Sequence, residues 1–148
     1  MKATKGFTLV ELLMTIAISG LIFGVVAALI FQLSTVSGAG NNRLTAIHDL
    51  QNASYWFNND GQMAVSAGTS LNNLTFTKPD GSSVIYSWSG SNLTRTENTA
   101  VITLAQNISN ATFTIQSRLV SMNLTSTVTR RTTASENFNY QVYMRVQP

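Results

Sequence analysis

The side chains that could do chemistry are few and scattered in this sequence. It has one histidine, His48, and no cysteine, so disulfides and thiolate metal sites are excluded. A serine hydrolase would need His48 to be paired with a serine and an acid, and no Gly-x-Ser-x-Gly motif is present. Neither the spacing of a calcium loop nor a glycine-rich phosphate loop occurs. We therefore predict no catalytic residue, no metal, no cofactor and a protein that is not an enzyme.

One carboxylate occupies an unusual position. Glu11 is the single charged residue in the apolar run Phe7–Leu33, FTLVELLMTIAISGLIFGVVAALIFQL. A helix rises about 1.5 Å per residue, so Leu12–Phe31 alone would cross a hydrocarbon layer of about 30 Å. A charge inside such a segment is costly and usually has a partner. Glu11 therefore needs an explanation beyond membrane insertion.

Three interpretations of this segment compete. A cleaved secretory signal has an apolar region of about 7–15 residues, and this run is too long and contains an acid. A plain signal anchor fits the length and the flanking Lys2 and Lys5, which would remain cytoplasmic, but it leaves Glu11 unexplained.

The third interpretation accounts for every part. The leader MKATKG and the following FTLVELLMTIAISGLI resemble the N-terminus of type IV prepilins and pseudopilins, the class III signal. The residues that match are Lys2, Lys5, Gly6, Phe7, Thr8, Leu9 and Glu11.

This resemblance implies cleavage after Gly6 by a prepilin peptidase on the cytoplasmic side, with N-methylation of Phe7. It also implies three further partners, namely other pilin or pseudopilin subunits, the inner-membrane assembly platform and membrane lipid. The implied location is a single pass through the cytoplasmic membrane with the head outside, followed by a periplasmic or cell-surface filament.

Cleavage would give Phe7 a new amine at the membrane edge. A buried carboxylate is tolerated where it meets such an amine from a neighbouring helix, so we expect Glu11 to set the register of stacked helices. The alternative is a carboxylate that is simply protonated in the bilayer. Gly20 and Gly24 form a small-xxx-small pair that could let helices approach closely, or they are two lipid-facing glycines without a role.

The next segment, residues 34–61, predicts an amphipathic continuation of the helix. Ser37-Gly38-Ala39-Gly40 forms a soft joint at which the helix either kinks or runs through, and Asn41 or Asn42 could cap a restart. An apolar stripe then recurs every three or four positions, and Asp60-Gly61 is the expected stop. The stripe consists of Leu44, Ile47, Leu50, Ala53 or Ser54, and Phe57.

Residues 62–148 predict a β-rich head. Short alternating runs are separated by turn residues such as Pro79-Asp80-Gly81 and Ser89-Gly90-Ser91-Asn92. The clearest alternation covers Val120–Val128 and Phe138–Val146. Strands that follow one long helix without a βαβ rhythm indicate antiparallel pairing and a pilin-like α+β fold. We thus expect a leader over 1–6, an assembly helix over 7–33, its amphipathic continuation over 34–61 and the head over 62–148.

The order of residues in this half is similar to that of minor pilins of the W type and minor pseudopilins of the J type, so we expect a filament subunit. The residues that carry this resemblance include Ile85-Tyr86-Ser87, Leu93-Thr94-Arg95, Ala111-Thr112-Phe113 and Tyr143-Met144-Arg145. A competence pseudopilin for DNA uptake is the first rival, because Arg118, Arg130 and Arg131 could contact phosphates. The formal charge of +3 falls to +1 when Lys2 and Lys5 are removed (3 − 2), and we do not expect nucleic acid as a partner. An uncleaved membrane-anchored receptor or enzyme is the second rival.

Overall fold

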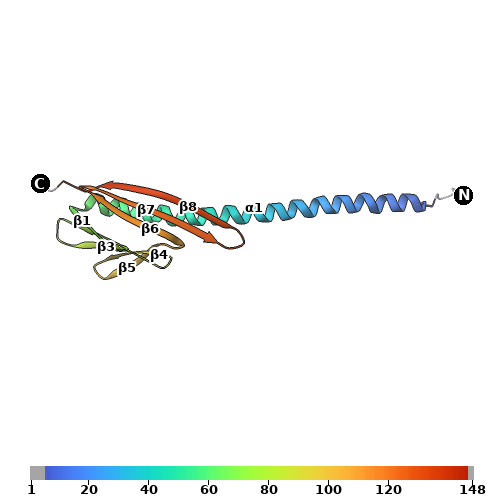
Figure 1. Ribbon diagram of the computed structural model, residues 1–148. Helices are drawn as coiled ribbons and strands as arrows, with labels where there is room; N and C mark the ends of the chain where they lie inside the picture. Colours follow the sequence, from blue (N-terminus) through green and yellow to red (C-terminus); the bar gives the residue numbers. More distant parts are fainter. Residues whose placement is uncertain (1–5, 147–148) are drawn as a thin grey trace. The chain divides into compact units, whose positions relative to one another are not determined.

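The computed structural model describes residues 6–146, so Lys2 and Lys5 of the expected leader lie outside the described part. Its single described helix, α1 (Leu9–Met63), is followed by strands alone (Figure 1). The strands are β1 (Ser66–Ser70), β2 (Asn73–Thr77), β3 (Ser83–Ser89), β4 (Asn92–Glu97), β5 (Ala100–Ala105), β6 (Ile108–Gln116), β7 (Leu119–Thr129) and β8 (Thr133–Tyr143). The α+β prediction is confirmed.

The strands form two antiparallel sheets rather than one. Their orders are β1-β2-β3-β4-β5 and β6-β7-β8, so each strand pairs with the next one along the chain within its sheet. Connections of a few residues permit only this antiparallel hairpin pairing. Gly81 and Gly90 adopt positive φ angles of 83° and 60° in two of the turns, as the turn sequences predict.

The chain divides into two compact units, one ending at Gly38 and the other beginning at Ala39. The first unit is helical from Leu9, and its large apolar side chains are exposed throughout. The helical residues of the second unit lie between the two sheets. The Phe57 ring contacts Phe76 and Tyr86 of the larger sheet, and the Tyr140 hydroxyl of the smaller sheet donates to the Leu50 carbonyl.

The buried stripe of α1 differs from the predicted one. Ala46, Leu50, Ala53 and Phe57 are buried, whereas Leu44 is 56% exposed and its assignment to the core was wrong. Leu44 precedes Leu50 by six residues, which places it about 120° away around the helix. Alanines carry part of this stripe because the sheets approach the helix closely.

The expected helix stop at Asp60-Gly61 was also wrong, because α1 continues to Met63. Gly61 is buried in the helix, and a Cβ atom there would lie 2.3 Å from Cγ1 of Val142 on β8. The missing side chain therefore permits close contact between helix and strand rather than a left-handed cap. The expected soft joint at residues 37–40 is helical, and Asn42 does not cap a restart.

The predicted alternation is confirmed in β7, where Val120, Met122, Leu124 and Val128 are buried. On β8 and just beyond it, Val142 and Met144 are buried. Phe138 is 40% exposed and stacks on Tyr140 with a centroid distance of 6.0 Å. The two sheets thus bury one face each against the helix.

Candidate functional site

The N-terminus of α1 is closed by a reciprocal contact between Thr8 and Glu11. The Thr8 amide and hydroxyl donate to Oε2 of Glu11 at 3.0 and 2.9 Å, and the Glu11 amide donates to the Thr8 hydroxyl at 3.3 Å. This is a capping box, in which a threonine and a glutamate three residues later satisfy amides that have no partner within the helix. The Thr-x-x-Glu spacing is visible in the sequence, yet our interpretation of Glu11 overlooked it.

The capping box gives Glu11 a partner in its own chain. A carboxylate near the start of a helix is also stabilised by the partial positive charge of that end. The pairing of Glu11 with an amine of a neighbouring subunit stays a prediction, and the two contacts are compatible because a carboxylate has two acceptor oxygens.

Gly6 and Phe7 precede the first helical residue, Leu9. The Phe7 side chain is 82% exposed, and a Cβ atom at Gly6 would meet nothing within 4 Å. The peptide bond between them therefore lies in open, non-helical backbone, the kind of segment that a peptidase can bind. Cleavage at this bond and methylation of Phe7 stay predictions.

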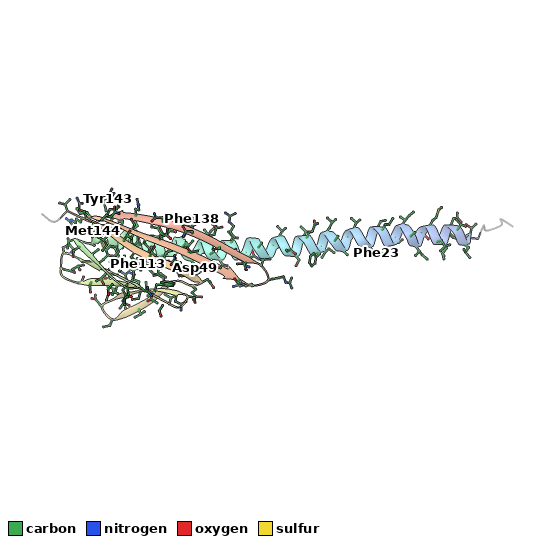
Figure 2. All side chains as sticks on the ribbon, in the orientation of Figure 1. Phe23, Asp49, Phe113, Phe138, Tyr143 and Met144 are labelled. Atoms are coloured by element: carbon green, nitrogen blue, oxygen red, sulfur yellow. The ribbon has the colours of Figure 1, made fainter. Side chains whose placement is uncertain are left out.

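The apolar part of α1 is long and apolar enough to cross a membrane. Figure 2 shows the Phe23 side chain on this segment, where it is 74% exposed. A Cβ atom at Gly20 or Gly24 would meet nothing within 4 Å. The two glycines lie one turn apart on one face of the helix, and their role in helix packing stays a prediction.

A buried ionic cluster lies at the other end of α1, and sequence reasoning missed it. Asp60 is 1% exposed and accepts hydrogen bonds from Nε of Arg95 at 2.7 Å, Nη2 of Arg95 at 2.8 Å and the Tyr86 hydroxyl at 2.5 Å. Arg95 also donates to Glu97 at 2.7 Å, and its guanidinium lies 4.7 Å from the centroid of the Trp56 ring.

The titration behaviour of this cluster follows from its burial and hydrogen bonds. Burial, together with the hydrogen bond to Asp60, raises the pKa of Tyr86 far above its usual value. The hydrogen bond to Asp60 raises the pKa of Arg95, and hydrogen bonds from Lys78 and Arg95 lower the pKa of Glu97. Every member has a partner inside the cluster, so it joins α1 to β3 and β4 rather than presenting a reactive group.

The remaining chemically capable residues are not brought together. His48 is exposed, while the Asp49 carboxylate accepts hydrogen bonds from the Gln106 amide at 3.1 Å and the Asn107 side chain at 3.2 Å. Within residues 6–146, no group of three histidine or acidic side chains could hold a metal ion. The Asp49 carboxylate thus joins α1 to the connection between β5 and β6, which is a structural contact.

The arginines considered for phosphate binding are also separated. Arg118 precedes β7 and donates to the Met144 carbonyl at 2.6 Å, whereas Arg130 and Arg131 are exposed in the turn after β7. A strand of 11 residues spans about 36 Å, so the three side chains form no single phosphate-binding patch.

Comparison with known families supports the N-terminal interpretation. Residues 1–31 match the family described as the prokaryotic N-terminal methylation motif. No curated protein and no solved structure matches the chain. The chain thus carries the class III methylation motif of type IV pilins and pseudopilins, a family whose members are generally structural. The motif implies processing by a prepilin peptidase, and together with the apolar helix it points to an inner-membrane prepilin that enters a surface filament.

Proposed function

We propose that this chain is a minor pilin or pseudopilin, a structural subunit of a type IV pilus or a type II secretion-like filament. It is exported, cleaved after Gly6, methylated on Phe7 and assembled through α1. The observation that carries the proposal is the methylation motif, which leads directly into a helix with exposed apolar side chains from Leu9 to Val36.

The exposed apolar surface explains why such a helix needs two environments. Burying one large aliphatic side chain is worth about 1.5–3 kcal/mol, so a helix that exposes many of them does not persist in water. Lipid covers these side chains before assembly, and helices of neighbouring subunits cover them afterwards. Gly20 and Gly24 would let one such neighbour approach closely.

Glu11 supplies the register in this proposal. Cleavage creates an amine on Phe7, and a buried carboxylate is stabilised where a neighbouring subunit brings that amine within contact. The capping box with Thr8 holds the Glu11 side chain at the helix start, which prepares it for this contact.

The first experiment tests processing. The intact mass of the protein from assembled filaments should correspond to a chain that begins at Phe7 and carries one additional methyl group. Gly6→Leu should block cleavage and leave the precursor in the membrane. Assembled protein that retains Met1–Gly6 would show that the proposal is wrong.

A second experiment separates the two roles of Glu11. Glu11→Gln removes the charge and keeps the shape, so the variant should be cleaved and stable in the membrane but missing from sheared filaments. Thr8→Val is the matched control, because it removes the hydroxyl that contacts both the carboxylate and the amide of Glu11, while it keeps the charge of Glu11 and the bond from the backbone amide of residue 8. If Thr8→Val causes the same loss, Glu11 acts by capping the helix. If Glu11→Gln enters filaments at the wild-type level, the charge pair is dispensable.

The narrower assignment to W-type minor pilins or J-type pseudopilins rests only on the resemblance of the residue pattern between Ile85 and Arg145. The rival role in DNA uptake has one observation in its favour, the exposed Arg130 and Arg131 in the β7–β8 turn. Those arginines would make DNA binding weaken steeply as the salt concentration rises. Salt-sensitive binding of duplex DNA by the purified chain, lost in the Arg130→Ser/Arg131→Ser variant, would favour that role.

A further inference from the structure

One edge of the five-stranded sheet lacks the usual protection against pairing. β5 pairs with β4 alone and is the last strand in the sheet order. Its sequence, AVITLA, contains no charge and no proline, and Val101 and Ile102 are 62% and 37% exposed. The opposite edge is β1, a short polar strand that lies near β6. Edge strands usually carry a charge, a proline or a cover, and β5 has none of these over its first four residues.

The hairpin geometry shows which backbone groups of β5 face outward. Asn98 and Thr99 form a two-residue turn, and both have positive φ angles, 46° and 73°. In such a hairpin the residues flanking the turn, Glu97 and Ala100, form a hydrogen-bonded pair, and the pairs then alternate. The amide and carbonyl groups of Val101 and Thr103 therefore point away from β4.

Helix α1 covers only the far end of this edge. Asn52 donates to the Leu104 carbonyl at 2.5 Å, and the Gln106 amide donates to Asp49 at 3.1 Å. The stretch Ala100–Thr103 lies before these contacts, and all four residues are exposed. The open part of the edge is thus long enough for a short strand and is bounded by the helix.

An aromatic pair lies beside the open stretch. Trp56 is one helical turn beyond Asn52, and its ring lies under the guanidinium of Arg95, the residue directly opposite Ile102 on β4. Tyr55 is 69% exposed and meets the Trp56 ring edge-on at a centroid distance of 5.7 Å. Trp56 is half-buried against the core, so Tyr55 is the exposed member of the pair. Exposed aromatic residues supply anchor contacts that dominate binding energy in protein interfaces.

We propose that Ala100–Thr103, together with Tyr55 and Trp56, binds an extended segment of another protein, which adds a sixth strand to this sheet. The main chain of that segment hydrogen-bonds to Val101 and Thr103, and its apolar side chains pack on Val101 at one face and on Ile102 and Tyr55 at the other. A segment that makes these contacts carries no charged residue, and its side chains point alternately to the two faces of the sheet.

The choice of a different protein as the occupant rests on the proposed function. Two copies that paired through their β5 strands would form a closed two-fold dimer. A filament subunit instead uses two different surfaces, one toward each neighbour, so an edge that pairs only with itself would stop its growth. A segment of a different protein satisfies the edge without closing the assembly.

Crosslinking tests the proposal directly, because the chain contains no cysteine. Val101→Cys and Thr103→Cys, each in the full chain and labelled with a benzophenone maleimide, are illuminated in membranes of the native cells. Each should form one discrete adduct with a different protein. The two partner residues identified by mass spectrometry should lie two positions apart, as paired strands require. Leu71→Cys, at a fully exposed turn, is the control position and should not give this adduct.

A proline variant tests whether main-chain pairing is the cause. Val101→Pro removes an amide that faces outward and leaves the bonds to β4, so the fold should survive. The adduct formed by the labelled Thr103→Cys chain should fall about tenfold when Val101→Pro is added to it. Thr69→Pro is the matched control, since Thr69 lies opposite Leu74 in the β1–β2 hairpin and also faces outward. Near-ultraviolet circular dichroism checks that both proline variants remain folded.

Several outcomes would overturn the inference. The first is a processed chain that gives no adduct, and the second is an adduct with a second copy of the chain or with lipid. The third is a pair of partner residues that do not lie two positions apart. The fourth is an adduct whose yield Val101→Pro leaves unchanged. Failure of the proposed function is distinguishable from these outcomes, because the membrane protein would then retain Met1–Gly6.

Discussion

Removing Arg95 from the buried ionic cluster should destabilise the protein strongly. In Arg95→Met, the carboxylate of Asp60 keeps the Tyr86 hydroxyl as a donor but loses both hydrogen bonds to the guanidinium. Asp60 is 1% exposed, so water does not replace them. An uncompensated charge therefore remains in the core.

The magnitude follows from this burial. Breaking a buried ion pair by removing one partner costs about 3–5 kcal/mol, because the remaining charge keeps its desolvation cost and loses its attraction. Domains of this size are stable by about 5–15 kcal/mol, so the change consumes much of the margin. Replacing both partners leaves no stranded charge. The double variant Asp60→Asn/Arg95→Met should therefore be more stable than Arg95→Met alone, although it contains one more substitution.

Denaturant unfolding of the full chain in mild detergent measures these differences, with tryptophan fluorescence as the signal. Trp56 is a direct reporter because it contacts the guanidinium of Arg95. Arg43→Met is the control for an ion pair at the surface, since the Arg43 side chain is 66% exposed and its contact with Glu136 is 2.7 Å. Such exposed pairs contribute at most about 1 kcal/mol.

Two results would refute the reasoning. If Arg95→Met costs no more than Arg43→Met, the buried contact contributes no more than an exposed one. If the double variant is less stable than Arg95→Met by the full cost of the Asp60→Asn single variant, the two residues are not coupled and the cluster is not a unit.

Three further predictions concern the packing of the head. Leu50→Asp should abolish cooperative thermal unfolding, because Leu50 is fully buried, whereas Leu44→Asp should be tolerated at its exposed position. Gly61→Ala should cost about 1–3 kcal/mol in denaturant unfolding through overlap with Val142, and Val142→Ala in the same chain should recover part of that loss. The raised pKa of Tyr86 means that folding favours its protonated form. This contribution to stability is fully present below about pH 10, the ordinary tyrosine pKa, and is lost as the pH rises further. Tyr86→Phe should therefore reduce the fall of the unfolding midpoint at alkaline pH.

The parts of the fold that the sequence predicts are those encoded by near neighbours. The length of the apolar run and the alternation in β7 each depend on residues within one segment, and the helix and that strand follow from them. The Thr8–Glu11 capping box is equally local, because its two residues are three positions apart and the Thr-x-x-Glu spacing is itself the signal.

The parts that the sequence does not predict depend on residues far apart in the chain. Asp60 and Arg95 are separated by 35 residues, and an aspartate before a glycine looks like a helix stop until Arg95 and Tyr86 supply its donors. Ala46 lies in the core in place of Leu44, because the sheets come close to the helix. A prediction from apolar periodicity favours the larger side chain, Leu44, over an alanine. Tertiary contact therefore overrides local preference at these positions.

The buried face of α1 combines small residues, two large apolar side chains and polar contacts near its ends. Ala46, Ala53 and Gly61 let the strands approach the helix closely, and Leu50 and Phe57 fill the space between helix and sheets. A hydrogen-bonded pair is more exacting than an apolar contact, because its geometry holds at one register only. Near one end of the face the Asn42 side chain donates to the Thr132 carbonyl at 2.6 Å, and at the other Asp60 accepts from two strands. The alanine-rich face thus supplies the close approach, and the two buried polar contacts select the register in which the sheets pack on the helix.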